Sequence, residues 1–393
     1  MTSNKKTISD SILYKIRGKM CGKNAHFRFN QALSPLASKV NDTSIYIHIP
    51  FCKSLCPYCP YNRIPYEELK MNQYMNALEK EIHYFSESFG KKNISSVYIG
   101  GGTPILAGEK LMGLTKMLKD NYNIEGDMCI EANPNDITEE SVKILKDSGF
   151  STLSIGVQSF DDSLLKSIGR KYSSADAENA VRKAMSAGFT SVNIDLLFAL
   201  PEESDKQLDL DIEKAISLNP SQITLYPLFT FPYSEISAFN KIKSVKSPSI
   251  LKRRKMYYKL YNTLENAGYE RCSVWSFKKN SSVKRYSSVT RERYMGFGAS
   301  AGSYHETHFD LNTFDVSEYI KSVEKKGHST ALRVKFTKRM AKLYDFYWRL
   351  YDTDIPVKRE LALFSYSIAG ERDLVFYMKL MLYLKLAYKN EEG

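Results

Sequence analysis

Three cysteines stand close together near the start of the chain, and their spacing is the clearest pointer to chemistry in this sequence. Cys52, Cys56 and Cys59 form a C-x3-C-x2-C motif directly after a β-rich run. Thiolate sulfurs are the soft ligands that iron–sulfur clusters need, and three of them on one loop can hold three irons of a [4Fe-4S] cluster. The fourth iron is then left open to bind a small molecule.

A structural zinc ion is the alternative for the same three cysteines. Such a zinc site takes four protein ligands, so it would need His48 or a distant residue to complete its shell. The remaining cysteines, Cys21, Cys129 and Cys272, are widely separated and supply no second cluster of ligands. The sequence therefore favours an iron–sulfur cluster and leaves zinc open.

Glycines and polar residues stand at or near the ends of the β-rich runs that follow. They are Gly100, Gly101, Gly102, Thr103, Glu131, Gln158 and Asp195. The glycines would let the backbone approach a ligand closely, and the polar side chains could hydrogen-bond to it. One such residue is usually an ordinary polar strand end. Because active sites gather at the carboxyl ends of parallel strands, we expect this group to surround one site with the cysteines.

The elements that must position these residues follow a regular order. The β-rich runs are 44–49, 95–100, 127–132, 151–157, 191–198 and 222–228, and helical patterns lie between them. One helix is predicted to begin after the capping residue Thr138 and to stop at Gly149. Strands that alternate with helices in this way predict a parallel sheet.

A weak internal repeat supports this prediction. A small residue, a glycine and an aromatic residue recur at 148–150, 187–189 and 267–269. We interpret each glycine as a left-handed helix C-cap before the chain turns into a strand. The predicted fold class is α/β, a partial (β/α)6 barrel with an N-terminal lead-in over 1–43 and a small, mostly helical C-terminal domain over 331–393. The barrel itself spans 44–330.

Composition excludes several protein classes. The chain has 393 residues, of which 43% are hydrophobic and 25% charged, as in globular proteins. No apolar run is long enough for a transmembrane segment, and the start lacks a secretory pattern. Six cysteines, three of them within eight residues and the others scattered, do not form a disulfide framework and indicate a reducing compartment, so we expect a cytoplasmic protein.

The net charge of +12 is concentrated in one segment. Residues 241–293 contain 15 Lys and Arg against 3 Glu. Leu251, Met256, Leu260 and Leu264 have near-helical spacing there, so the cations can be the solvated face of a helix. The alternative is a patch that binds an acidic substrate or partner. Nucleic acid is disfavoured, because no signature of a nucleic-acid-binding module is present.

The cysteine motif lies within YIHIPFCKSLCPYC, which resembles the radical S-adenosylmethionine (SAM) superfamily. The resemblance is to the branch of the oxygen-independent coproporphyrinogen III oxidases and their haem-chaperone relatives (HemN/HemW-like). Further matching stretches are GGGTP at 100–104, EANP at 131–134, GVQSF at 156–160, GR at 169–170, NIDLLFALP at 193–201 and GFG at 296–298. Together they cover about residues 44 to 315.

The resemblance implies that SAM binds the open iron and is cleaved, with an electron from a donor such as flavodoxin or ferredoxin, to methionine and a 5′-deoxyadenosyl radical. It implies SAM contacts or cluster neighbours at Tyr46, Tyr58, Gly100, Gly101, Gly102, Thr103, Glu131, Gln158, Arg170 and Asp195. Some relatives bind a second SAM beside the first, for which Pro227 and Gly302 are further aligned positions. No catalytic residue is assigned.

The expected reaction follows from where the sequence departs from the branch. The oxidases carry a fourth cysteine two places after the third, whereas Tyr61 stands there in this chain. Haem chaperones have an aromatic residue at that place, but the stretch CSVWSFKKN at 272–280 differs from theirs. We therefore expect C-methylation, with a second SAM, of a planar acidic aromatic or tetrapyrrole-like substrate. Porphyrinogen oxidation and a non-catalytic haem chaperone are the alternatives.

Overall fold

The computed structural model describes residues 29–36, 41–229, 248–279, 293–305 and 307–353. Residues 31–305 with 309–333 form one compact unit. The other described residues, 29–30, 307–308 and 334–353, belong to a second unit. The domain boundaries predicted near 43 and 330 stay a prediction.

Six adjacent parallel strands form the centre of the sheet in the first unit. In spatial order they are β2 (Asp42–Ile49), β5 (Asn93–Gly101), β6 (Asn123–Ala132), β7 (Thr152–Gln158), β8 (Ser191–Phe198) and β9 (Gln222–Pro227). These are the six β-rich runs of the sequence, so the predicted α/β fold with a parallel sheet is confirmed.

Shorter strands extend this sheet on both sides. Next to β2 lies β12 (Tyr294–Phe297), also parallel, followed by β13 (Gly302–Tyr304), β14 (His308–Asn312), β15 (Thr330–Lys335) and β1 (Asn30–Gln31). Beyond β9 lie the antiparallel strands β11 (Ser276–Lys278) and β10 (Glu270–Arg271). Since β1 and β10 end the order of the described strands, the barrel is partial, as expected.

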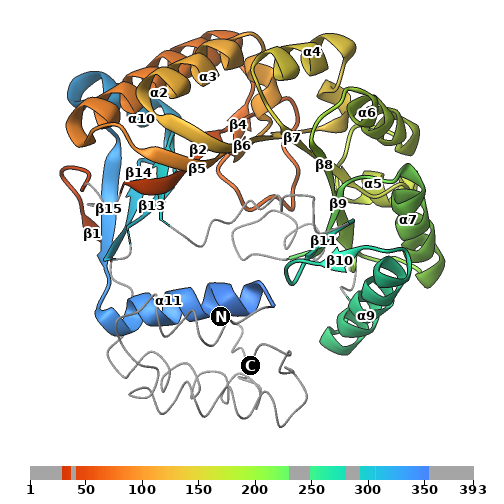
Figure 1. The fold of residues 1–393 in the computed structure, drawn as a ribbon. Coiled ribbons are helices and arrows are strands. Elements are labelled where there is room, and N and C mark those ends of the chain that lie inside the picture. The colour runs from red at the N-terminus through yellow and green to blue at the C-terminus, as the bar shows by residue number, and fades with distance from the viewer. Residues whose placement is uncertain (1–28, 37–40, 230–247, 280–292, 306, 354–393) are drawn as a thin grey trace, which may run out of the picture. The chain divides into compact units, whose positions relative to one another are not determined.

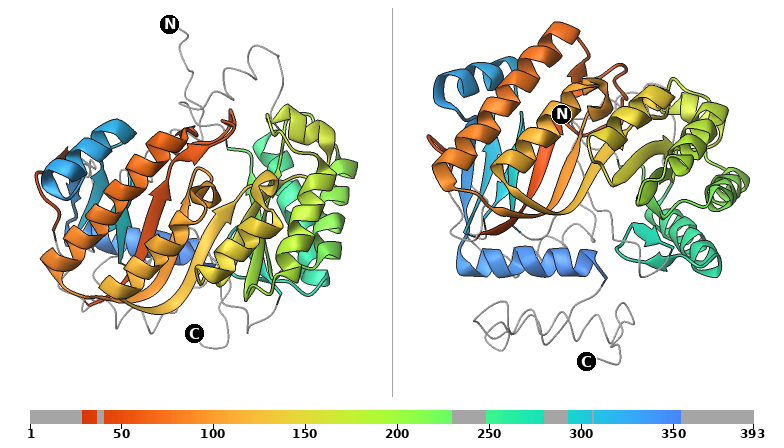
Figure 2. Two further views of the ribbon diagram at one scale, coloured as in Figure 1. Left: turned by 90° about the horizontal axis from the view of Figure 1, so that it is seen from above. Right: turned by 45° about the horizontal axis from the view of Figure 1, so that its top comes forward.

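Helices cover the outer face of the curved sheet (Figures 1 and 2). They are α2 (Glu68–Phe89), α3 (Lys110–Asn121), α4 (Glu139–Asp147), α5 (Asp162–Ser167), α6 (Ser174–Ser186), α7 (Asp205–Leu218), α9 (Ile250–Asn266) and α10 (Val316–Lys326), with short 3-10 turns η1 (Pro104–Ala107) and η2 (Pro134–Asp136). None of the described helices is both long and apolar enough to cross a membrane.

The predicted helix ends have the expected local geometry. The hydroxyl of Thr138 accepts a hydrogen bond from the amide of Ser141, and the side chain of Ser141 bonds back to the amide of Thr138, which completes a capping box. Gly149, Gly188 and Gly268 have φ values of 87°, 72° and 82°. The left-handed turns predicted from the repeat are therefore confirmed.

Helix α9 carries the densest described part of the basic segment, Lys252 to Lys255. Met256, Leu260 and Leu264 are buried against the barrel, as the spacing predicted. Leu251, which was expected on the same face, is 78% exposed. It lies in the first turn, before the helix packs against its neighbours. The parts of the segment at 241–247 and 280–292 lie outside the described residues.

In the second unit, α11 (Lys338–Tyr351) begins after the capping residue Thr337. The ring of Trp348 contacts those of Tyr344 and Tyr351 at centroid distances of 5.9 and 5.5 Å, so these three aromatic residues pack along one helix. Residues 331–335 of the predicted C-terminal domain belong to β15, and residues 354–393 lie outside the described residues.

Candidate functional site

The cysteine loop leaves the carboxyl end of β2 and is closed by a short ladder. Strand β3 (Phe51–Cys52) pairs with β4 (Ile64–Pro65), and the amide of Tyr66 donates to the carbonyl of Cys52 at 2.9 Å. Within the loop the amide of Cys59 donates to the carbonyl of Cys56 at 3.2 Å. These bonds fix where the loop begins, turns and ends, so the three thiols belong to one short ordered segment.

The three cysteines line a cavity of about 330 Å³ at the carboxyl ends of the parallel strands. All of the predicted site residues line it except Tyr46 and Gly100: they are Cys52, Cys56, Cys59, Tyr58, Gly101, Gly102, Thr103, Glu131, Gln158, Arg170 and Asp195. The expectation that these strand ends meet around the cysteines therefore agrees with the geometry. Pro227 also lines the cavity, whereas Gly302 does not.

Tyr46 and Gly100 lie behind the cavity lining. The hydroxyl of Tyr46 is 2.8 Å from Nδ1 of His48, and its ring is 6.0 Å from that of Tyr98. A Cβ atom on Gly100 would lie 2.7 Å from the ring of Tyr98 and 3.0 Å from the carboxyl group of Glu131. Both residues thus adjoin the side chains that hold Glu131 in place.

Glu131 is fixed by the neighbouring strand. One carboxyl oxygen accepts from the hydroxyl of Tyr98 and the other from the amide of Gly101 at 3.1 Å. Burial raises the pKa of Glu131 above its usual range, although both hydrogen bonds act in the opposite direction. The carboxyl group is therefore oriented before any ligand binds.

Asp195 is held in the same way on β8. It accepts hydrogen bonds from the hydroxyl of Ser154 and the amide group of Asn193, each at 3.0 Å. Burial, and secondly the negative charge of Glu131, raise the pKa of Asp195 to about 7. A carboxyl group of this kind changes charge near neutral pH and becomes a better partner for a cation once it is ionised.

Arg170 supplies the positive charge of the cavity. Its guanidinium carbon lies 5.7 and 5.5 Å from the ring centroids of Tyr58 and Tyr172, and its Nη1 donates to the side chain of Asn133 at 3.3 Å. The arginine is thus stacked in place and lines the cavity, where its positive charge suits a ligand carboxylate.

The thiols are in surroundings that favour metal binding over free thiolates. Burial raises the pKa of Cys52 to about 11 and also raises that of Cys59. The hydroxyl of Thr103 donates to Sγ of Cys52 at 3.7 Å, and Nη2 of Arg63 donates to the carbonyl of Cys56 at 2.5 Å. Buried thiols ionise when a metal neutralises their charge, so this donor set fits an iron–sulfur cluster.

The zinc alternative fits less well. His48 was the nearby candidate for a fourth ligand, but its Nδ1 contacts the hydroxyl of Tyr46 and its Nε2 is 2.9 Å from the carbonyl of Asn62. Neither ring nitrogen is left for a metal. Within the described ranges, no three His, Cys, Asp or Glu side chains are arranged to hold one metal ion. A cluster differs because its cysteines bind separate irons.

Sequence reasoning missed several residues of the site. Arg63 and Tyr61 line the cavity from the end of the cysteine loop, and Tyr226, Leu228 and Phe229 line it from the end of β9. Tyr61 and Phe229 are 60% and 42% exposed. The run QITLYPLFTF at 222–231 was a signal for the aromatic wall, because it continues past the predicted strand end.

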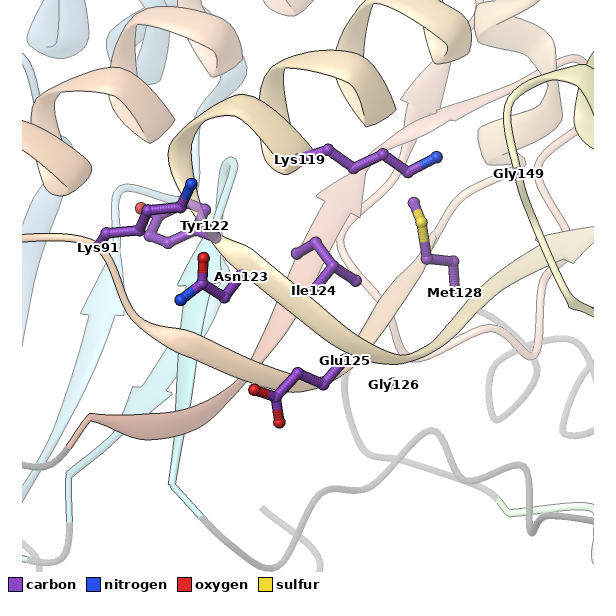
Figure 3. Close-up of a pocket in the computed structure, with 9 residues that line it drawn as sticks. All are labelled: Lys91, Lys119, Tyr122, Asn123, Ile124, Glu125, Gly126, Met128 and Gly149. Carbon is purple, nitrogen blue, oxygen red and sulfur yellow. The ribbon is translucent and has the colours of Figure 1, made fainter.

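A second hollow, of about 520 Å³, lies at the opposite end of β6 (Figure 3). Lys91, Lys119, Asn123 and Glu125 are among its lining residues. Asn123 begins β6, and Glu131 is eight residues further along it, which corresponds to about 26 Å in an extended strand. This hollow contains none of the predicted site residues, and it lies away from the cysteine loop.

The comparisons with known proteins agree with this geometry. The family model described as "Radical SAM superfamily" matches residues 46–215. "Heme chaperone HemW" of Bacillus subtilis is 32% identical over 291 residues, which cover 72% of this chain and 76% of the relative. "Oxygen-independent coproporphyrinogen III oxidase" of Salmonella typhimurium is 27% identical over 304 residues, which cover 73% of this chain and 66% of the relative.

A solved structure shares the fold. The coproporphyrinogen III oxidase HemN of Escherichia coli, described as a radical SAM enzyme, superimposes with a TM-score of 0.76 at 23% sequence identity. The superposition covers 88% of this chain and 83% of that chain. At this level of identity the similarity establishes the partial barrel.

Proposed function

Because this chain belongs to the radical SAM superfamily, in the HemN/HemW-like branch, we propose that it binds a [4Fe-4S] cluster and SAM in the cavity beside the cysteine loop and acts there on a tetrapyrrole. The resemblance seen in the sequence is thus confirmed. One observation carries the proposal: a single cavity is lined by the three cysteines, the glycine turn after β5 and polar residues from three further strands.

Within the proposal the cysteine loop holds the cluster. Cys52, Cys56 and Cys59 supply three thiolates, and the hydroxyl of Thr103 hydrogen-bonds to the first of them. When bound, the cluster and SAM supply reductive cleavage to methionine and a 5′-deoxyadenosyl radical, which removes a hydrogen atom from carbon. The task of the protein is to bind, orient and shield these groups.

The charges around the cavity suit SAM. SAM carries a sulfonium and an ammonium group, which favour the carboxyl groups of Glu131 and Asp195. It also carries a carboxylate, which favours the guanidinium group of Arg170. Gly101 and Gly102 have no side chain between the backbone and the cavity. The sequence predicts one SAM molecule or two, and both numbers stay predictions.

The part of the cavity wall at the end of β9 suits a flat ring system. Tyr226, Leu228 and Phe229 line the cavity beside the polar strand ends, and the exposed ring of Tyr61 lines it from the cysteine loop. Aromatic side chains can stack on a macrocycle, and Arg63 supplies a cation for an acidic substituent. An apolar wall also keeps water away from a reactive radical.

Haem binding and transfer is the first candidate activity. The specific observation for it is Tyr61, an aromatic residue at the place where the oxidases carry a fourth cysteine. The relatives that are 32% and 30% identical are also named haem chaperones.

Porphyrinogen oxidation is the second candidate, supported by relatives of that name and by the ionisable groups Glu131 and Asp195 beside the cysteine loop.

Methyl transfer by a second SAM, the reaction expected from the sequence, has no support in the names of the relatives cited above. Methyl transfer stays a prediction, and the formation of S-adenosylhomocysteine tests it. A planar acidic substrate and a flavodoxin or ferredoxin as electron donor likewise stay predictions.

The test uses anaerobically reconstituted protein supplied with SAM and a chemical reductant, first with haem and then with coproporphyrinogen III. Haem that remains bound through gel filtration, without conversion of the porphyrinogen, supports the chaperone. Conversion with formation of 5′-deoxyadenosine supports the oxidase, and S-adenosylhomocysteine supports methyl transfer. A Cys52→Ala, Cys56→Ala, Cys59→Ala variant should lose SAM cleavage, whereas the control Cys272→Ala should keep it. Absence of both SAM cleavage and haem binding in the parent protein would contradict the proposal.

A further inference from the structure

Gln158, a proposed SAM contact, has an unusual backbone. Its φ is +68°, a left-handed value that side-chain-bearing residues rarely adopt. It ends β7, its side chain lines the cavity, and the residue is only 8% exposed. Such a conformation persists only where neighbouring groups hold it, so the structure must contain the groups that do so.

The residues directly after Gln158 are held by one carboxyl group from another element. Asp211, on α7, accepts from the hydroxyl of Ser159 at 2.7 Å and from the amide of Phe160 at 2.6 Å, with a different oxygen for each. Asp211 is 4% exposed and 52 residues away in sequence from Ser159. Both of its oxygens are therefore used on the turn that follows Gln158.

The far side of this turn is fixed by the cap of α5 and by the hydroxyl of Ser159, the same group that bonds to Asp211. The amide of Asp161 donates to the hydroxyl oxygen of Ser159 at 3.0 Å, and the side chain of Asp161 caps α5 by accepting from the amide of Leu164 at 2.9 Å. The turn thus lies between the cap of α5 and the carboxyl group of Asp211. Loss of Asp211 would release it on one side only.

The position of Gln158 also affects its neighbours in the cavity. A Cβ atom on Gly156 would lie 2.8 Å from Nε2 of Gln158 and 3.5 Å from Nη2 of Arg170. The amide of Gln158 and the guanidinium of Arg170 thus both lie over Gly156. A shift of Gln158 would change the space beside the proposed carboxylate-binding arginine.

We propose that Asp211 is a positioning residue of the SAM site, which holds the 159–160 turn so that Gln158 keeps its left-handed backbone and presents its amide group to the cavity. This inference rests on the proposed function, because it needs SAM in that cavity. Asp211 itself acts only through the turn.

The chemistry of Asp211 distinguishes two substitutions. Asp211→Asn keeps an oxygen acceptor for the amide of Phe160 and offers an NH2 group to the hydroxyl oxygen of Ser159. Asp211→Ala removes both partners. Burial raises the pKa of Asp211 to about 6, although the hydrogen bonds from Ser159 and Phe160 act in the opposite direction, and asparagine keeps a polar group of the same shape at this place. The asparagine variant should therefore rescue what the alanine variant loses.

The experiment measures SAM dissociation constants by calorimetry on cluster-loaded protein. Because one mispositioned hydrogen-bonding group corresponds to about 1.4 kcal/mol, we expect about tenfold weaker binding for Asp211→Ala and less than about threefold for Asp211→Asn. The control is Asp209→Asn, on the same helix, whose carboxyl group pairs with Lys259 at the surface. It should leave SAM affinity unchanged.

A double-mutant cycle with Gln158→Ala tests the route of the effect. If Asp211 acts through Gln158, then Asp211→Ala in the Gln158→Ala background should change SAM affinity by less than about twofold. Additive losses would overturn the proposal. Should Asp211→Ala fail to fold, Ser159→Ala removes the hydroxyl that bonds to Asp211 and to the amide of Asp161, and the same cycle applies to it.

The outcomes separate this inference from the function beneath it. Weaker binding for Gln158→Ala with no effect of Asp211→Ala overturns only the positioning role. Unchanged binding for Gln158→Ala removes Gln158 from the SAM site and overturns both that assignment and the positioning role.

Discussion

Replacing Gly101 with alanine should destabilise the protein through one identifiable contact. Gly101 ends β5 with a φ of 118°, and a Cβ atom there would lie 2.7 Å from Cε1 and 2.8 Å from Nδ1 of His48. The imidazole is 3% exposed, and both of its nitrogens are engaged, with Tyr46 and with the carbonyl of Asn62. The ring cannot move aside without losing these two partners.

The size of the effect can be worked out from these contacts. A side chain forced into an unfavourable backbone region costs about 1–3 kcal/mol. Two lost hydrogen bonds of the buried imidazole add about 1 kcal/mol each. We therefore expect Gly101→Ala to lower the free energy of unfolding by about 3–5 kcal/mol.

A matched glycine isolates the contact with His48. Gly188 also has a left-handed φ, 72°, but a Cβ atom there would meet nothing within 4 Å. Gly188→Ala should therefore cost only the backbone strain, about 1–2 kcal/mol. Urea unfolding of both variants and the parent, followed by circular dichroism under reducing conditions, measures the difference. Equal losses for the two variants would refute the argument from His48.

Three further predictions concern charge. Burial raises the pKa of Asp195 to about 7, so the carboxyl group is largely neutral at pH 6 and largely ionised at pH 8. SAM affinity, measured by calorimetry, should therefore rise as the pH increases through 7. A flat profile identical to that of Asp195→Asn would contradict this prediction. Glu81 is fully buried and accepts hydrogen bonds from Gly298, Tyr319, Asn312 and Ser329. Glu81→Gln turns an NH2 group toward these donors, so it should lower the free energy of unfolding, measured by urea titration, by about 2–4 kcal/mol. A change below about 0.5 kcal/mol would be incompatible with that network. If the basic segment binds an acidic substrate or partner, replacing Arg253, Arg254 and Lys255 with Gln should weaken that binding and make it depend less on salt concentration. If binding at low salt is unchanged, these three residues are only a solvated helix face.

Most of the barrel could be predicted from the sequence because its signals are local. β-branched runs, a capping threonine and glycines after helices each act within a few residues, and the six predicted strands occur as expected. The three cysteines and most polar strand ends were also predictable as one group, since parallel strands bring their carboxyl ends to one edge.

The rest depends on contacts between distant segments. Tyr46 and Gly100 matched the family pattern, yet they are not among the residues that line the cavity. A sequence pattern does not tell which side chains pack between a residue and the cavity. Asp211 was missed for a similar reason. Its partners Ser159 and Phe160 belong to another βα unit. The one local signal was its place on the apolar face of its helix, three residues after Leu208 and four before Ala215.

The electron paramagnetic resonance spectrum of the reduced protein, recorded with and without SAM, tests the central claim most directly. If Cys52, Cys56 and Cys59 hold a [4Fe-4S] cluster whose fourth iron is open, the parent should contain about four irons and four sulfides per chain, and SAM should change the spectrum of the reduced cluster. The variant with all three cysteines replaced by alanine should show neither. A cluster retained in that variant, or a parent spectrum unaffected by saturating SAM, would contradict the account.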